Sequence, residues 1–494
     1  MKKGILKELL LYGGGDLIPK FLGLVIFPIY THIFSPNEFG LINILLTGIT
    51  FYTSFSLLGV DSAVSKFFYE KDNTADKGGQ LIKTGLVFIS AWGLFLFALL
   101  IGLGVMFYSK CSRCSVIPVE LIFMSIGLTL PSVILQYVLS ILRIQLRSQL
   151  FVYVSVISGV INIFMTLLLV KYLDLGMVGY FLGISFSSIP ALIYVLFKIE
   201  NVFINKYSFQ KLRQILKFSV PIFFYGLASW VLLSMDRWML LYLESSAEVG
   251  IYSIGLKFGV VMYFFTSAFN KGVIPIILKK YNEDQSAGQA LIKKLFTYWF
   301  LSVAFVGNLV CLAIPYFFDW FIAKEYESSI VVSLVLVFNG IVSSLTFFTG
   351  IGLYLKNKTR IIFYGSILAI VLNFFLNLIL INLMSTIGAA IATLLSTFFV
   401  GMFYLVLSYS NLKINFEWSK LVSLLLFQTL LISAMILVLK FYFNPLTRFG
   451  LNLTLFLAWL IILFILKIIP ISYLKDIRNI LKKIMLIRLY AHRK

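Results

Sequence analysis

Apolar runs of about twenty residues recur along the chain from Leu9 to Pro470, separated by short segments with charge, Gly, Pro or Asn. A helix of that length spans the hydrocarbon core of a bilayer, which is about 30 Å thick. Stretches such as 421–438 are almost continuously apolar, whereas the strands of outer-membrane barrels alternate polar and apolar residues. Because helices satisfy their own backbone groups in lipid, we predict an all-α integral membrane protein.

The distribution of charge supports a membrane location. Of the 494 residues 60% are hydrophobic and 12% are charged, and the formal net charge is +21. The cations lie at the ends of the apolar segments, which is typical of loops held on the cytoplasmic side and not of nucleic-acid binding. The first span follows Lys2, Lys3 and Lys7 without a cleavage site, so we expect a retained helix.

The segmentation predicts about fourteen transmembrane helices. Their expected ranges are 9–32, 39–62, 82–108, 118–142, 151–171, 175–197, 218–242, 248–273, 295–317, 329–354, 361–382, 386–409, 421–440 and 450–469. Cation-rich loops alternate with cation-poor ones, which predicts that both termini are cytoplasmic.

An internal repeat organises these spans. Pro-Asn-Glu-Phe-Gly at 36–40 matches Ser-Ala-Glu-Val-Gly at 246–250, and residues 151–162 align with 362–373 at nearly the same offset. Even numbers of spans in each half make the repeats parallel, so we expect two six-helix lobes that face each other across a central cavity and rock in alternating access. The predicted domains are the lobes at 1–210 and 211–415, an added helix pair at 416–470, and a basic amphipathic tail at 471–494. The tail either lies on the inner leaflet or is loosely ordered.

Ionisable residues inside spans are candidates for function, because each costs at least about 2.5–3.5 kcal/mol to insert. The cations are Lys20, Arg237, Lys257 and Lys271, and the acids are Asp16, Asp61 and Asp236. The excess of cations favours an anionic ligand. Structural alternatives remain: Asp16 with Lys20 and Asp236 with Lys257 as neutralising pairs, and Asp61 and Lys271 reaching water by snorkelling.

Two predicted helices at equivalent positions of the repeat contain prolines. The first span contains Pro19 and Pro28 and the seventh contains Pro221. Proline removes a backbone hydrogen bond, so we expect these helices to bend or break, as discontinuous helices do at transporter binding sites.

The sequence contains few residues suited to metal binding or redox chemistry. Cys111 and Cys114 form a lone C-x-x-C, Cys311 stands apart, and His32 and His492 are the only histidines. A zinc site needs about four ligands, so we interpret the pair as coincidental, with a redox pair or half a zinc site as the alternatives. We expect no metal site and no cofactor.

Several motifs resemble a known family. They are Leu-Ser-Met-Asp-Arg-Trp-Met-Leu-Leu-Tyr-Leu at 233–243, Glu-Val-Gly-Ile-Tyr-Ser at 248–253, Phe-Ser-Pro-Asn-Glu-Phe-Gly at 34–40, and Asn373 to Asn377 before Ile-Gly-Ala-Ala at 387–390. The chain thus resembles the bacterial Wzx-type polysaccharide flippases of the multidrug/oligosaccharidyl-lipid/polysaccharide exporter superfamily, which have a MATE-like fold.

The resemblance implies a function. It implies translocation of undecaprenyl-pyrophosphate-linked oligosaccharide to the outer leaflet of the bacterial inner membrane, in O-antigen (lipopolysaccharide), capsule or exopolysaccharide assembly. A polysaccharide polymerase and a chain-length regulator are the implied protein partners. Lys20 and Arg237, with Lys257 and Lys271, would bind the pyrophosphate, and Asp16, Asp61 or Asp236 would respond to H⁺ or Na⁺. Tyr12, Tyr225, Trp230 and Trp238 would stack on sugars, with packing against lipid as the alternative.

Other functions share this architecture. A MATE-like multidrug antiporter and a flippase for the peptidoglycan precursor are the alternatives among transporters. A membrane polysaccharide polymerase or a lipid-linked glycosyltransferase is the alternative among enzymes. The predicted outer loops are short and no cluster of His or carboxylates suits acid–base catalysis, so we do not expect an enzyme.

Overall fold

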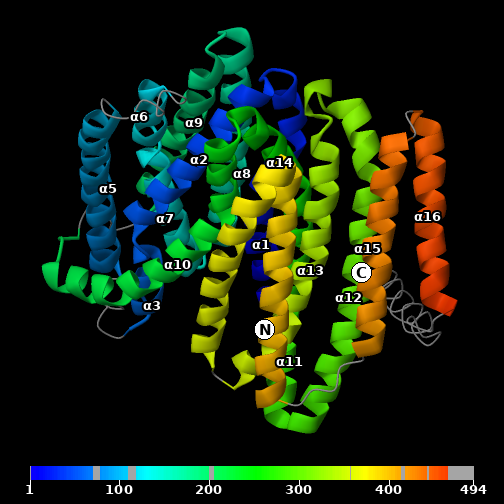
Figure 1. Cartoon of the computed structure of the whole chain (residues 1–494). Coiled ribbons are helices and arrows are strands. Elements are labelled where there is room, and N and C mark those ends of the chain that lie inside the picture. The colour runs from blue at the N-terminus through cyan, green and yellow to red at the C-terminus, as the bar shows by residue number, and fades with distance from the viewer. Residues whose placement is uncertain are drawn as a thin grey trace, which may run out of the picture. The chain divides into compact units, whose positions relative to one another are not determined.

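The computed structural model of the protein describes residues 2–70, 78–108, 118–199, 205–356, 358–412, 418–441 and 444–465. Within these ranges the side chains of 2–14, 16, 17, 103–108, 119, 225, 271, 359, 411 and 418 are not described. Every regular element of the described residues is helical, which confirms the predicted all-α fold class (Figure 1).

The helices follow one another through short connections (Figure 1). Those of the first part are α1 (Lys2–Thr31), α2 (Pro36–Leu57), α3 (Val60–Phe67), α5 (Gly79–Tyr108), α6 (Val119–Gly127), α7 (Leu130–Ile144), α8 (Ser148–Leu167), η2 (Leu168–Tyr172) and α9 (Gly176–Lys198). Those of the second part are α10 (Phe209–Leu243), α11 (Ser246–Glu283), α12 (Gln285–Phe321), η3 (Lys324–Tyr326), α13 (Ser329–Leu355), α14 (Thr359–Asn411), α15 (Trp418–Phe441) and α16 (Pro445–Ile465).

Twelve helical segments of the described residues are long and apolar enough to cross a membrane. One of them, Arg360–Ser410, has 51 residues. At about 1.5 Å per residue it is more than twice as long as a bilayer core is thick. It is broken at Ser385, where φ is 49° and ψ is −127°, and there the chain turns back (Figure 1). The break falls in the gap between the predicted spans 361–382 and 386–409, and the total of about fourteen stays a prediction.

The prolines of α1 and α10 do not interrupt their helices. Both helices continue through Pro19, Pro28 and Pro221, so of the expected bend or break the break is absent and the bend stays a prediction. The predicted span 39–62 instead divides into α2 and α3 at Leu58 and Gly59, whose φ angles are 45° and 71°.

The described residues pack into two compact units. The first comprises residues up to Ile254 together with Phe321–Glu327 and Ser366–Ala392, and the second comprises Gly255–Trp320, Ser328–Gly365 and the described residues from Thr393 on. In the core of the first unit the fully buried Tyr137 of α7 donates its hydroxyl hydrogen to Ile82 O of α5, at 3.0 Å. The lobe boundaries drawn from the sequence repeat stay predictions.

In the second unit, polar contacts join the last two helices to α12. Asn308 Nδ2 of α12 donates to Gln428 Oε1 of α15 at 3.1 Å, and Gln428 Nε2 donates back to Asn308 Oδ1. Arg448 of α16 forms an ion pair with Asp319 at the end of α12, at 3.2 Å. Amide pairs of this kind hold helices together in a medium where apolar contact alone gives little preference.

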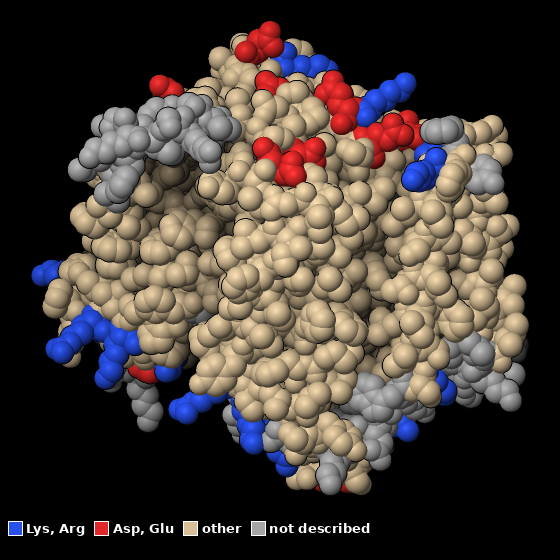
Figure 2. All heavy atoms as spheres, viewed as in Figure 1, with Lys and Arg blue, Asp and Glu red and all other residues tan. Residues whose placement is uncertain are grey.

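The visible surface carries few charged side chains. Figure 2 shows that uncharged residues form most of the described surface on this face, with the Lys, Arg, Asp and Glu in separate small groups. Glu38 and Glu248 lie in the first turns of α2 and α11. A surface poor in charge suits the hydrocarbon layer, and the sidedness of the helix ends stays a prediction.

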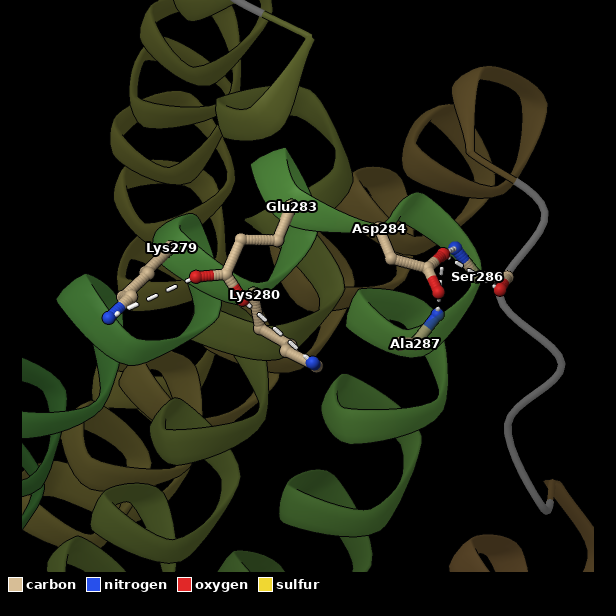
Figure 3. A network of polar contacts seen from close by, with 6 residues as sticks. All are labelled: Lys279, Lys280, Glu283, Asp284, Ser286 and Ala287. Atoms are coloured by element: carbon tan, nitrogen blue, oxygen red, sulfur yellow. Dashed lines mark hydrogen bonds and ion pairs between the residues drawn. The ribbon is translucent and has the colours of Figure 1, made fainter.

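The junction between α11 and α12 shows how one helix end is capped (Figure 3). Asp284 Oδ1 accepts hydrogen bonds from the backbone N–H of Ser286 at 2.8 Å and of Ala287 at 3.2 Å, and from Ser286 Oγ at 2.9 Å. The Ser286 hydroxyl and these N–H groups lower the pKa of the Asp284 carboxyl below its ordinary value. Asp284 is therefore an ionised N-cap of α12.

Candidate functional site

A buried carboxylate lies within the membrane-spanning part of α10. Asp236 is 5% exposed, and no apolar environment tolerates such a group without partners. Its Oδ2 accepts the hydroxyl hydrogen of Tyr252 from α11 at 2.6 Å, and its Oδ1 accepts from Asn377 Nδ2 of α14 at 2.7 Å. The charge predicted from sequence is thus held by two side chains that sequence reasoning did not assign to the site.

Two asparagines extend this cluster along one face of α14. Asn377 Nδ2 also donates to Asn373 Oδ1, one turn away, at 3.0 Å. Both asparagines are buried, and Asn377 Oδ1 has no hydrogen-bond partner. We call Asp236, Tyr252, Asn373 and Asn377 the Asp236 cluster. An i,i+4 pair of asparagines inside an apolar span was the sequence signal that could have identified them.

Arg237 follows Asp236 in α10 and is incompletely hydrogen-bonded. Its Nη2 donates to Leu233 O, one turn earlier, at 2.9 Å, while its buried Nε has no partner. The side chain is half-buried. A guanidinium carries five N–H donors in a planar fork that suits phosphate and carboxylate groups. The buried Nε of this membrane-embedded cation thus lacks a hydrogen-bond partner.

The two motifs of the sequence repeat meet each other in the first unit. A Cβ atom at Gly40 would overlap Ser246 O and lie 2.9 Å from Gly250 N, and one at Gly250 would overlap Pro36 O and lie 3.2 Å from Gly40 N. Ser246 Oγ donates to Asn37 Oδ1 across the same junction. We call this junction of 36–40 with 246–250 the helix-start contact.

Capping differs between the two repeats. In α2, Ser35 and Glu38 form a closed capping box, since Glu38 Oε2 accepts from Ser35 N at 3.0 Å. In α11, Glu248 N donates to Ser245 Oγ at 3.3 Å, but the Glu248 carboxylate accepts instead from Ser385 Oγ at 3.0 Å. Glu248 therefore ties the start of α11 to the turn inside α14.

The segment 321–327 is bonded to the same region. Ala323 N donates to Thr31 Oγ1 at 3.2 Å, and Tyr326, which is fully buried, donates its hydroxyl hydrogen to Phe34 O at 2.8 Å. Burial, and then the carboxylates of Glu325 and Glu38, raise the pKa of the Tyr326 hydroxyl, so it stays a donor throughout the physiological range. The end of α1 and the start of α2 are thereby fixed to the loop before α13.

The remaining predicted site residues are distributed as follows. Lys20 is exposed on α1, and Asp61 is half-buried in the first turn of α3. Lys257 is half-buried and belongs to the second unit. Trp230 and Trp238 both line one pocket of the first unit. The roles expected for these residues stay predictions.

Several sequence predictions lie outside what the structure describes. The side chains of Tyr12, Asp16, Tyr225 and Lys271 are not described, so their stacking, pairing and binding roles are not tested. Cys111, Cys114 and the tail 471–494 lie outside the described residues. Within the described residues, no group of three or more His, Cys, Asp or Glu could hold a metal ion.

Solved structures with a similar fold are membrane transporters. The fold matches a structure titled "Lipid II flippase MurJ, inward closed conformation" with a TM-score of 0.66 and 17% identity, over 91% of this chain and 98% of that one. It matches an inward-facing multidrug resistance MATE family transporter of the MOP superfamily with a TM-score of 0.59 and 11% identity, over 80% of this chain and 97% of that one. The predicted MATE-like fold is confirmed.

Sequence comparison gives the family. A membrane protein of Haemophilus influenzae is 24% identical over 320 residues, which cover 63% of this chain and 74% of that protein. Residues 5–281 match the family described as "Polysaccharide biosynthesis protein". The match covers more than half of the 494 residues and includes the first repeat, Asp236 and Arg237. The chain is a multi-pass membrane protein that belongs to the polysaccharide biosynthesis protein family.

Proposed function

We propose that this protein is a flippase that moves undecaprenyl-pyrophosphate-linked oligosaccharide across the bacterial inner membrane by alternating access. Three findings support the proposal: the family, the transporter fold shared with the MurJ and MATE structures, and Arg237 in a membrane-spanning helix, whose buried Nε has no hydrogen-bond partner. In this proposal both termini are cytoplasmic, and the glycan serves O-antigen, capsule or exopolysaccharide assembly beside a polymerase and a chain-length regulator.

Arg237 is the observation that carries the proposal. A cation at membrane depth is costly and persists where it has a ligand or a partner. Arg237 Nη2 donates a hydrogen bond to a backbone carbonyl, and its buried Nε has no partner. A pyrophosphate would supply several acceptor oxygens in the geometry that a guanidinium prefers. In the proposal Arg237 binds the pyrophosphate, and Lys20, Lys257 and Lys271 contribute as predicted from sequence.

The Asp236 cluster is proposed to respond to the coupling ion, H⁺ or Na⁺. Its donor set is made of oxygens: the two carboxylate oxygens of Asp236, Asn373 Oδ1 and the unpartnered Asn377 Oδ1. Carboxylate and amide oxygens suit a hard cation, and a carboxylate in this setting also suits a proton. Either ion would neutralise Asp236. Asp16 and Asp61 stay in the proposal as further ion-responsive acids.

A transport assay tests the function. The protein is reconstituted in proteoliposomes with a fluorescent undecaprenyl-pyrophosphate oligosaccharide, and movement between leaflets is measured in wild type and in Lys20→Ala and Arg237→Ala variants. We expect both variants to lose most of the transport when the same amount of protein is reconstituted. Arg213→Ala is the matched control, because Arg213 is an exposed arginine of the same helix, α10, and its loss should leave transport intact. Full transport by both test variants would remove these residues from the mechanism.

A second function is favoured by one observation. The MurJ structure, named for lipid II, matches over 91% of this chain, so a flippase for the peptidoglycan precursor is the competing proposal. Rescue of murein synthesis in a strain without its own lipid II flippase would support it, and rescue of surface polysaccharide alone would support the first proposal. Under both proposals the protein is a transporter and not an enzyme.

A further inference from the structure

A pocket of about 290 Å³ lies between α2, α5, α6 and α10 of the first unit. Aromatic rings of Phe51, Tyr52, Trp230 and Trp238 form much of its wall, Gly48 forms another part, and aliphatic side chains complete it. The pocket is at the lower limit of small-molecule sites, which span about 300–1,000 Å³. It is thus large enough for part of a chain and small for several sugars.

Three polar side chains in the wall are already paired with backbone carbonyls. Trp230 Nε1 donates to Thr47 O at 3.2 Å, Tyr52 Oη donates to Gly93 O at 2.9 Å, and Ser125 Oγ donates to Ile122 O at 3.0 Å. The Phe51 and Trp230 rings pack with centroids 4.7 Å apart. With their polar ends bonded to backbone, these residues present rings and methylenes to the pocket. An apolar ligand needs no hydrogen bonds in such a pocket, whereas a sugar bound there would have hydroxyl groups without hydrogen-bond partners.

A cation lies on the same stripe of α10. Residues 230, 237 and 238 are spaced i, i+7 and i+8, which places them on one face of a helix. Arg237 Nη2 reaches back to Leu233 O, in the direction of Trp230, and its Nε has no partner. Along this face of α10 an apolar pocket is followed by a cation. A ligand with an apolar chain joined to an anionic group has the same order.

We infer that the pocket binds the isoprenoid chain of the lipid-linked substrate, at the end next to the pyrophosphate, while Arg237 binds the pyrophosphate itself. The inference rests on the proposed function and adds the place where the lipid enters the protein. α2, α5 and α6 belong to the first predicted lobe and α10 to the second. A chain in the pocket therefore stabilises the arrangement in which these helices meet.

Gly48 provides a way to fill the pocket. A Cβ at Gly48 would meet no atom within 4 Å, so Gly48→Leu adds a side chain in the pocket without disturbing backbone packing. Gly102→Leu is the matched control, because Gly102 is an exposed glycine of α5 that also has no neighbour within 4 Å. The probe is radiolabelled polyprenyl pyrophosphate without sugar, and its binding is measured on the full-length protein in nanodiscs.

We expect Gly48→Leu to weaken binding of the probe at least about tenfold, since it displaces several buried methylenes, and Gly102→Leu to leave it unchanged. Arg237→Gln should weaken binding of the pyrophosphate but not of the uncharged polyprenol, whereas Gly48→Leu should weaken both. Unchanged binding in Gly48→Leu would overturn the inference. So would equal competition by an ordinary phospholipid, which makes the pocket an acyl-chain site, or competition by the free oligosaccharide, which makes it a sugar site.

The same proteins are then used in the transport assay. Loss of glycan transport in Gly48→Leu together with normal transport in Gly102→Leu supports the inference. Equal glycan transport rates in wild type and Gly48→Leu would overturn the inference and leave the proposed function intact. Tight polyprenyl pyrophosphate binding by a wild type that moves no glycan supports the pocket and contradicts the flippase.

Discussion

Gly40 and Gly250, the paired glycines of the sequence repeat, pack against each other with their backbones in direct contact. Neither position has room for a Cβ atom, because each would overlap a carbonyl oxygen of the other repeat. The contact is reciprocal, as expected of an interface between two copies related by a pseudo-twofold axis. The duplicated helices therefore meet at the positions where their sequences match.

Alanine at either glycine should disrupt the helix-start contact. Gly40→Ala is expected to destabilise the protein by about 1–3 kcal/mol, because backbone must move to admit the methyl group. Gly48→Ala, on the same helix with open space around it, should be neutral. Thermal unfolding of the purified variants measures the difference. Equal midpoints for the two variants would show that the contact is looser than described.

A disulfide across the same junction should stop transport if this contact opens during the cycle. Ser246 Oγ and Asn37 Oδ1 are hydrogen-bonded, so we choose these positions for the cysteines, and the extent of cross-linking is measured first. The double variant is made without Cys111, Cys114 and Cys311, which would otherwise compete for pairing. Transport should fall on oxidation and return with reductant. Cross-linked protein that transports at the full rate would exclude opening at this contact.

Removing the Tyr252 hydroxyl should take away one hydrogen bond that the buried Asp236 carboxylate accepts. Tyr252→Phe is expected to cost about 1–3 kcal/mol and to alter the ion dependence of transport. Tyr263→Phe is the control, since Tyr263 is 64% exposed on the same helix. Thermal unfolding measures the loss of stability, and transport rates measured over a range of Na⁺ concentrations and pH values measure the change in ion dependence. Identical ion profiles for Tyr252→Phe and wild type would limit this hydroxyl to a structural role.

The reciprocal amide pair of Asn308 and Gln428 should show coupling in a double-mutant cycle. Asn308→Leu or Gln428→Leu alone leaves the other buried amide without its partner and should lower the free energy of unfolding by about 1–2 kcal/mol. The double leucine variant should recover much of that loss. Unfolding of wild type, both single variants and the double variant gives the coupling energy. Additive losses would indicate that the pair does not hold α15 to α12.

The Asp284 cap should make the α12 start sensitive to acid. Its pKa is lower in the folded protein than its ordinary value. The ionised cap therefore stabilises the fold above that ordinary value, and the stabilisation is lost as pH falls through the lowered folded pKa. Asp284→Asn, a cap that does not titrate, should lack this component. Unfolding midpoints measured from neutral to acid pH should converge for the two proteins, and a constant difference would contradict the assignment.

The sequence determined the class of fold because a bilayer permits few solutions. Long apolar runs in lipid have to be helices, and the break at Ser385 falls in the predicted gap because a span of 51 residues cannot cross once. It also identified Asp236 and Arg237, since a charge within an apolar run is conspicuous. It paired Gly40 with Gly250 as equivalent positions, but equivalence in a repeat does not say that the two residues touch.

Contacts between distant residues were decided by the tertiary structure. Asp236 is bonded to Tyr252 sixteen residues away and to Asn377, which is 141 residues away, and no local pattern encodes that distance. The prolines of α1 and α10 were expected to bend or break their helices, and both helices continue through them without a break. The pocket beside Trp230 arises from four helices at once. Hydrophobicity along the chain fixes which segments enter the membrane, whereas packing among them fixes which side chains meet.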